Sequence, residues 1–446
     1  MRNKMKKIGI ILVVLLFQLA NAQEKVWTLD DCVQYAVEHN PQRVKQEAQN
    51  KIYRQDQREA LGKFLPSLNV YSNVYANFGR GIDPETNTYI SSNTFYNNYE
   101  INSSMVLFDG FSQIYRAKMA KINRLKGEDQ LRDTKDQLAL ETMELYFNVL
   151  YYKGTVGIAR QQLEESEANL KRIQRMEELG LKSVPDLAET NAKEAEDRFA
   201  LTKQMNLLEL EIIKLKTKMN YPVNDELFLA NYAPTDLTGK TNESAEEVYR
   251  QAIAVLPRLQ ASEKTVKASE MQYKVARGRL FPVLSLGAGM STGFSRMMDG
   301  NPYTPFEEQL KNRRGTYVGF SIQIPVINGF SASAEAKRSK QRFIIAQSEN
   351  EILFRQVYSE IEQAVADVNG LSDECRFARR RTEAMQSAHQ VNLRKYEEGL
   401  IDALELSTST NRLLNSRVEE LYANLKYQLK YKLLQYFKGE TLWTYN

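Results

Sequence analysis

Four acidic residues occur as two pairs with the same spacing, Asp186 with Glu189 and Asp402 with Glu405. Side chains three residues apart on a helix are neighbours on one face. For any single acid, a solvated helix face is the ordinary explanation. When symmetry repeats such a carboxylate around an axis, however, the resulting ring attracts cations and shapes a constriction. The chemistry available to these residues is therefore electrostatic selection rather than bond making.

The other reactive residue types are scarce. His39 and His389 are the only histidines, and neither has the spacing of a metal ligand or a catalytic triad. Residues 79–93 contain glycine but no phosphate-binding pattern. The sequence therefore predicts no enzyme activity and no cofactor or metal. Cys32 and Cys375 could form one disulfide, although two buried thiols are the preferred interpretation.

Residues 1–22 have the organisation of a secretory signal peptide. A basic start precedes an apolar run from Ile8 to Phe17, and the small residues Ala20 and Ala22 flank Asn21 before the expected cleavage site. A membrane anchor is the weaker alternative, because the run is too short to span a bilayer. The residue directly after the cleavage site is Gln23 rather than cysteine, so we expect no lipid anchor.

The charge of the chain indicates no nucleic-acid partner. There are 60 basic and 56 acidic residues, and four of the basic ones lie in the leader, so the mature chain is balanced at 56 of each. After the leader, no apolar run approaches the roughly 18 residues of a membrane helix. We therefore expect an exported chain that is either soluble or inserted in a membrane as strands.

The mature sequence is an internal duplication. Its domains are predicted as a first repeat over 23–220, a linker over 221–244, a second repeat over 245–438 and a tail over 439–446. Matching positions are Pro41 with Pro257 and Pro66 with Pro282 at an offset of 216, then Gly110 with Gly329 and Gly180 with Gly399 at an offset of 219. The offset increases by three between the two strand-like stretches of each repeat, where a loop can absorb an insertion.

Each repeat reads as helix, strand, strand, long helix, helix. Pro66 and Pro282 end the first helical stretch of each copy, because the residue before a proline avoids the helical conformation. Strands are predicted at about 66–79, 94–108, 282–295 and 315–327, where apolar and polar residues alternate. In each strand the apolar residues occupy alternate positions, all odd or all even, which we call its apolar parity. These residues are Leu68, Val70, Val74 and Ala76; Ile101, Met105 and Leu107; Leu284, Leu286, Ala288 and Met290; and Val318, Phe320, Ile322 and Ile324.

Glycine and heptad spacing describe the remaining segments. Gly110 and Gly329 are expected to let the chain turn from a strand into a helix. The helices that follow, 112–179 and 331–398, are each predicted at 68 residues, about 100 Å at 1.5 Å per residue. Sevenfold repeats indicate that neighbouring helices pair as coiled coils. The repeating positions are Val156, Leu163 and Leu170 with Ala159, Ser166 and Ile173, and Leu201, Leu208 and Leu215 with Met205, Ile212 and Met219.

Four strands per chain are too few to close a barrel. An open sheet edge is not tolerated in lipid, because each unpaired backbone group costs several kcal/mol there. Eight strands from two chains would fill their own interior, whereas twelve from three chains would leave a pore. If the strands are embedded in a membrane, we therefore expect a homotrimer.

At this point the sequence resembles the TolC-like outer-membrane efflux proteins, over roughly residues 26–440. The resemblance rests on the order and doubling of TLDDCVQYAVEHNP, LPSLNV and FPVLSL, LFDGF and VINGF, and EEGLIDALELSTSTNRLL. It implies a mainly α fold with a membrane β-barrel portion: a trimeric twelve-stranded barrel on a long α-helical coiled-coil tunnel in the periplasm. It also implies an exit duct in the outer membrane, serving a tripartite efflux pump or type I secretion system with a periplasmic adaptor and an inner-membrane transporter.

The resemblance also implies where the site residues lie. The turns at Gly180 and Leu181 and at Gly399 and Leu400 would close two helical hairpins and contact the adaptor. Relatives carry two gate acids three residues apart in the second copy, where this chain has Glu405 and Thr408, so Glu405 is the leading gate candidate. Asp402, Asp186 and Glu189 are further pore candidates. Candidates for aromatic anchors at the membrane surface are Tyr71, Tyr75, Tyr96 and Tyr99.

Two other functions fit part of the pattern. A soluble periplasmic coiled-coil adaptor or scaffold explains the long helices but not the four strands inserted at matching positions. A passive porin would need strands over most of the chain, whereas here they are a minority.

Overall fold

The computed structural model describes residues 26–82, 87–91, 93–230, 239–298 and 302–443, and the predicted signal peptide lies outside them. These residues form two compact units. The sheet unit comprises residues 48–129 and 260–353, and the hairpin unit comprises the other described residues. Among the described residues, none of the helices has a stretch that is both long and apolar enough to cross a membrane.

The elements follow the predicted order twice. In the first repeat they are α2 (Leu29–His39), α3 (Pro41–Gly62), β2 (Ser67–Asn77), β3 (Arg80–Ile82), β4 (Tyr89–Ser91), β5 (Thr94–Phe108), α4 (Ser112–Glu178) and α5 (Val184–Met219). In the second they are α6 (Ala245–Val255), α7 (Pro257–Gly278), β7 (Val283–Met297), α8 (Phe306–Asn312), β8 (Gly315–Gln323), α9 (Ser331–Glu397) and α10 (Ala403–Phe437). The sequence reasoning missed α8 and the short strands, and it extended the last strand of the second repeat four residues too far.

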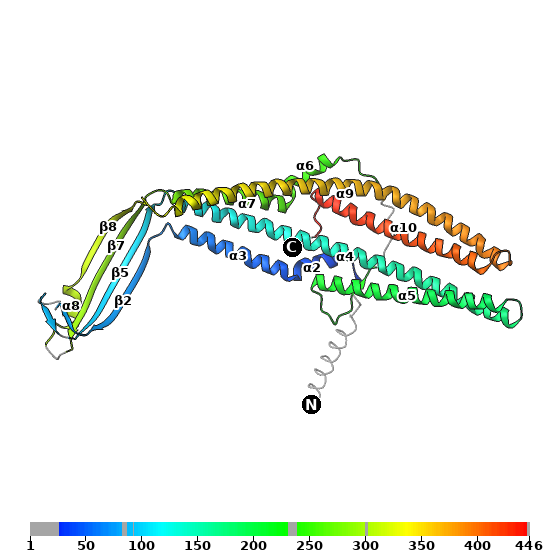
Figure 1. Ribbon diagram of the computed structural model, residues 1–446, viewed down its shortest axis with the longest axis horizontal. Coiled ribbons are helices and arrows are strands. Elements are labelled where there is room, and N and C mark those ends of the chain that lie inside the picture. The colour runs from blue at the N-terminus through cyan, green and yellow to red at the C-terminus, as the bar shows by residue number, and fades with distance from the viewer. Residues whose placement is uncertain (1–25, 83–86, 92, 231–238, 299–301, 444–446) are drawn as a thin grey trace, which may run out of the picture. The chain divides into compact units, whose positions relative to one another are not determined.

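The main sheet of the sheet unit is antiparallel with the order β2-β5-β7-β8, and its strands lie side by side in Figure 1; β3 and β4 form a separate two-stranded antiparallel sheet. Directly paired residues point to the same side of an antiparallel sheet. Leu68 pairs with Ser103, which pairs with Ala288, which in turn pairs with Val318. The predicted apolar parity of each strand therefore falls on one common side, which we call the apolar face. The opposite, polar face carries alternate residues such as Asn69.

The transitions between helix and strand depend on left-handed backbone. Gly110 and Phe111 have φ of 67° and 66°, and Gly329 and Phe330 have φ of 59° and 62°. At Gly110 the neighbourhood adds a second constraint, because a Cβ there would collide with the carbonyl oxygen of Gly278. Gly329 has no atom within 4 Å of that position, so there only the backbone angle favours glycine. Both glycines act as predicted.

The hairpin unit contains the later parts of α4 and α9, from residues 130 and 354 onward, which pair with α5 and α10 as antiparallel hairpins in Figure 1. Much of the predicted heptad seam is buried, including Ile173 and Leu215, each with no exposed surface. Met205 is the exception at 47% exposed. A straight α-helix drifts by about 20° per heptad, so a residue can leave the seam although its spacing is regular.

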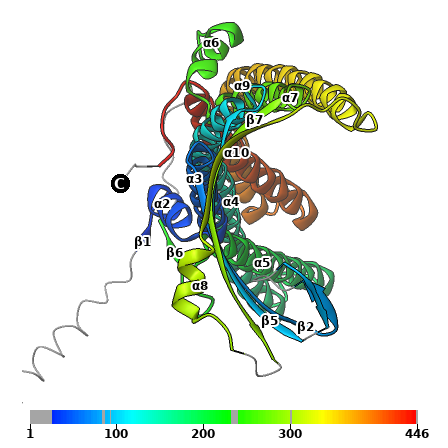
Figure 2. The same ribbon diagram turned by 90° about the vertical axis from the view of Figure 1, so that its left-hand side faces the viewer.

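A short parallel pair joins the start of the first repeat to the linker. β1 (Val26–Trp27) pairs with β6 (Phe228–Leu229) beside α2, as Figure 2 shows. Trp27 and Cys32 lie in a buried cluster with residues of α4 and α5. Cys32 and Cys375 are both buried and are not joined in a disulfide, which confirms the preferred interpretation.

Candidate functional site at the hairpin ends

The turn of the first hairpin is closed by backbone hydrogen bonds around a left-handed glycine. α4 ends at Glu178, and Gly180 follows with φ of 70°. The amide of Leu181 donates to the carbonyl of Met176 at 2.8 Å, the bond that satisfies a free carbonyl at a helix end. No atom lies within 4 Å of a Cβ added to Gly180, so the conformation, not packing, favours glycine.

The turn of the second hairpin repeats this geometry. Gly399 has φ of 75°, and the amide of Leu400 donates to the carbonyl of Lys395 at 2.8 Å. The side chains of Leu181 and Leu400 are each 67% exposed. The two hairpin ends thus present matching glycine turns, each with a solvent-exposed leucine.

Two of the four predicted pore acids cap helices. The Asp186 carboxylate accepts hydrogen bonds from the hydroxyl and amide of Ser183 at 2.7 and 3.1 Å, and these bonds lower the pKa of Asp186. The Asp402 side chain accepts from the amide of Glu405 at 2.8 Å at the start of α10. Both positions follow the helix rule that acceptors occupy the N-cap region. These two carboxylates therefore fix the chain direction as it enters α5 and α10.

The side chains of the other two predicted acids, Glu189 and Glu405, do not cap a described helix. Glu189 borders a cavity between the hairpins, and Glu405 is exposed in the first turn of α10. Glu405 makes no ion pair with another described residue, so its charge is uncompensated locally. Thr408, one turn further, donates its hydroxyl to the carbonyl of Leu404 at 2.9 Å.

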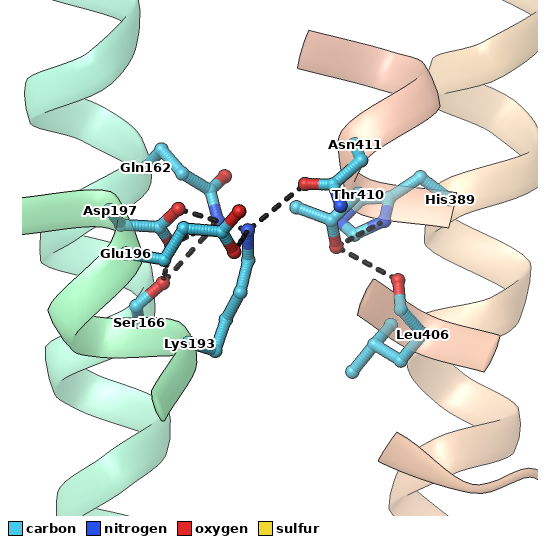
Figure 3. A network of polar contacts seen from close by, with 9 residues as sticks. All are labelled: Gln162, Ser166, Lys193, Glu196, Asp197, His389, Leu406, Thr410 and Asn411. Atoms are coloured by element: carbon cyan, nitrogen blue, oxygen red, sulfur yellow. Dashed lines mark hydrogen bonds and ion pairs between the residues drawn. The ribbon is translucent and has the colours of Figure 1, made fainter. Parts of the chain in front are cut away.

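A buried polar network joins α4 to α5 (Figure 3). The Asp197 carboxylate, 5% exposed, accepts from the amide of Gln162 at 3.1 Å and from the hydroxyl of Ser166. Lys193 pairs with Asp197 at 3.0 Å and with the exposed Glu196 at 3.1 Å. A buried carboxylate needs such donors, because desolvation disfavours its charged form.

The same lysine links the two hairpins. Lys193 Nζ donates to Asn411 Oδ1 of α10 at 3.0 Å, a contact visible in Figure 3. Nearer the turns, Arg172 of α4 forms an ion pair with Glu397 of α9 at 3.0 Å. The sequence reasoning identified none of these residues. The spacing of Lys193 and Asp197 could have suggested an i,i+4 pair, but no pattern points to the partners on the other hairpin.

A cavity of about 570 Å³ lies between the hairpins and is bordered by all four helices. His389 borders it and contacts the Thr410 hydroxyl at 3.5 Å. Burial lowers the pKa of His389, so the imidazole is neutral near pH 7. Among the described residues, no group of histidine, cysteine and acidic side chains could hold a metal ion.

Comparison with known proteins agrees with this architecture. The family model described as outer membrane efflux protein matches residues 248–436. The chain is 24% identical over 442 residues to the outer membrane protein TolC of Escherichia coli, covering 95% of this chain and 84% of TolC. It is also 24% identical over 292 residues to the pyoverdine export outer membrane protein OpmQ of Pseudomonas aeruginosa, and this match covers 63% of this chain. The chain spans 57% of the length of OpmQ and 63% of that of the efflux protein BepC of Brucella suis.

Solved structures show the same fold at low sequence identity. CusC superposes with a TM-score of 0.80 at 17% identity, covering 93% of this chain and 92% of CusC. VceC of Vibrio cholerae superposes with a TM-score of 0.78 at 13% identity, covering 92% of this chain and 96% of VceC. The arrangement of four strands and two long hairpins is thus shared across widely diverged sequences.

Proposed function

We propose that this chain is a TolC-like outer-membrane efflux protein and serves as the outer-membrane exit duct of a tripartite efflux pump or type I secretion system. Three copies join their sheets into a twelve-stranded barrel in the outer membrane, and their hairpins form a tunnel in the periplasm. A periplasmic adaptor and an inner-membrane transporter deliver the substrate.

The apolar face of the sheet is the observation that carries this proposal. Leu68 of β2 is 70% exposed, and Val318 and Phe320 of β8 are 77% and 70% exposed. β2 and β8 are also the two edges of the sheet within the described part of the chain. A soluble scaffold would leave this surface and both edges in water, where they promote aggregation. Closure with sibling sheets in lipid satisfies the edges and covers the face.

Glu405 is the group that we assign to the entrance. It lies exposed near the hairpin end, and a threefold axis would convert it into a ring of three negative charges. The contacts from Lys193 to Asn411 and from Arg172 to Glu397 hold the two hairpins of one chain together. Widening of the entrance would require at least some of these contacts to break.

The exposed turns are the surface that we assign to the adaptor. Leu181 and Leu400 offer apolar side chains on two similar turns, which suits a partner that contacts both repeats in the same way. The glycines at 180 and 399 set the backbone path that presents them.

Conductance in planar bilayers tests the channel and the gate separately. We expect the purified wild-type trimer to conduct and Glu405→Ala to lower its preference for cations over anions. Glu164→Ala, which removes an exposed acid from α4, serves as the charge-matched control. Unchanged current and selectivity in Glu405→Ala would reject the gate assignment, and a monomeric wild-type protein that conducts in no bilayer would reject the duct.

A further inference from the structure

Residues 302–314, which include α8 and precede β8, pack against the apolar face near the end of β7. The ring of Phe306 in α8 lies 5.3 Å from that of Phe294 and 6.5 Å from that of Tyr99, measured between centroids. Tyr303 lies 5.8 Å from Phe294. Tyr99 and Phe294 belong to the apolar parity, because Tyr99 pairs with Thr292, two residues from Phe294 on β7. An aromatic cluster therefore sits where the apolar face meets the loop end of the sheet.

α8 is held in this place by specific hydrogen bonds. The pairing of β8 with β7 stops at Ser291, so the β7 backbone beyond it has no neighbouring strand on that side. Gln309, 2% exposed, fills the gap: its side chain accepts from the amide of Ser295 at 3.0 Å and donates to the carbonyl of Ser295 at 2.9 Å. Arg313 donates to the Ser295 hydroxyl at 2.7 Å. These hydrogen bonds fix α8 against the unpaired edge of β7.

Three exposed basic residues belong to β7, to α8 or to the residues directly after α8. Arg296 lies over the ring of Tyr303 at 5.4 Å, while Lys311 and Arg314 are exposed at and just after the end of α8. None of these three makes an ion pair with another described residue. The acids of the segment that the structure describes, Glu307 and Glu308, occupy the first turn of α8, where they complement the helix dipole.

Along the apolar face of β7, Leu284 to Met290 are followed by Phe294 and then by Arg296. Apolar, then aromatic, then basic is the order of a membrane surface from its hydrocarbon core to its charged headgroups. The predicted anchor candidates divide accordingly. Tyr71, Tyr75 and Tyr96 have the parity of the polar face, so only Tyr99 of that set faces the lipid side.

We propose that α8 with Arg296, Lys311 and Arg314, which we call the α8 surface, binds the phosphates of anionic lipid headgroups at the loop end of the barrel. This inference rests on the proposed membrane function, because the apolar face must lie in lipid for the α8 surface to reach the headgroups. None of the three cations is neutralised by an ion pair with another described residue, and the hydrogen bonds between Gln309 and Ser295 hold α8, which carries Lys311, against β7.

Paired lipids with matched acyl chains test the proposal. The full trimer in detergent is titrated with diphosphorylated lipid A and with its monophosphorylated form, and binding is followed by native mass spectrometry. Each basic residue near an anionic lipid surface contributes about fivefold in affinity, so Arg296→Gln with Lys311→Gln and Arg314→Gln is expected to weaken diphosphorylated lipid binding on the order of 100-fold. The matched control replaces Lys51, Arg58 and Lys203, exposed basic residues on α3 and α5, with glutamine.

The outcomes separate the lipid site from the channel. The proposal is supported if wild type and control prefer the diphosphorylated lipid, and the triple variant loses that preference while keeping trimer assembly and conductance. It is overturned if the triple variant binds both lipids as wild type does, or if inorganic phosphate at the same concentration displaces the lipid fully. A wild-type protein that neither assembles nor conducts would contradict the proposed function instead.

Discussion

The buried ion pair of the first hairpin offers a quantitative prediction. In Lys193→Met, Asp197 stays 5% exposed and keeps only the neutral donors Gln162 and Ser166. Removing one partner of a buried pair costs about 3–5 kcal/mol. Because Lys193 itself is 18% exposed and the two hydrogen bonds remain, we expect the lower end, about 3 kcal/mol.

The reverse change should be milder. Asp197→Leu leaves Lys193 with Glu196 at 3.1 Å and Asn411 at 3.0 Å, so its charge keeps an acceptor and a counterion. We expect a loss of about 2 kcal/mol. The double variant, Lys193→Met with Asp197→Leu, places two apolar side chains between α4 and α5 and leaves no isolated charge. Such replacements are often neutral, so the double variant should be within about 1 kcal/mol of wild type.

The assay is chemical unfolding of the trimer followed by far-ultraviolet circular dichroism, arranged as a double-mutant cycle. Asn411→Ala isolates the contact between the hairpins, because it removes the partner of Lys193 on α10 and leaves Asp197 paired. That variant should lose no more than about 1 kcal/mol. Single variants within about 0.5 kcal/mol of wild type, or a double variant whose loss equals the sum of the singles, would refute this reasoning.

Three further changes test other parts of the structure. Gly110→Ala should abolish or strongly reduce trimer yield, because the new Cβ would collide with the Gly278 carbonyl. Gly329→Ala should lower the free energy of unfolding only by the roughly 1–2 kcal/mol that a left-handed alanine costs. Trimer yield on gel filtration compares the two variants. Ser183→Ala removes the two capping bonds made by the Ser183 hydroxyl at the start of α5 and should lower the free energy of unfolding by about 1 kcal/mol, measured by denaturant titration. Burial raises the pKa of Asp133 to about 6, above its ordinary value of 3.8. The folded state thus retains a proton that the unfolded state releases, so stability should fall as pH rises from about 4 to 6. Asp133→Asn should flatten that part of the thermal stability profile, and an unchanged slope would reject the assignment.

The duplicated pattern allowed much of the fold to be predicted from the sequence. Alternation of period two gave the strands and their faces, because side chains on a strand alternate regardless of what surrounds it. Pro66 and Gly110 marked the transitions, since their effects on the backbone are local. The helical turns at Gly180 and Gly399 were found for the same reason.

Contacts between distant segments could not be predicted in this way. The bond from Lys193 to Asn411 joins helices of different repeats, and neither residue is unusual for an exposed helix position. The capping roles of Asp186 and Asp402 required knowledge of where α5 and α10 begin. α8 escaped notice because a seven-residue helix has too few turns for a periodic signal, and its position depends on Gln309 meeting Ser295.

The sequence by itself determined the repeats, the order of helices and strands, and which side of each strand is apolar, because these follow from local backbone and side-chain preferences. Only the tertiary structure decided the strand register, the contacts between the hairpins, and the placement of α8 against the aromatic end of the sheet. Those features depend on residues far apart in the chain, whose partners are selected by packing and by the need to satisfy buried polar groups.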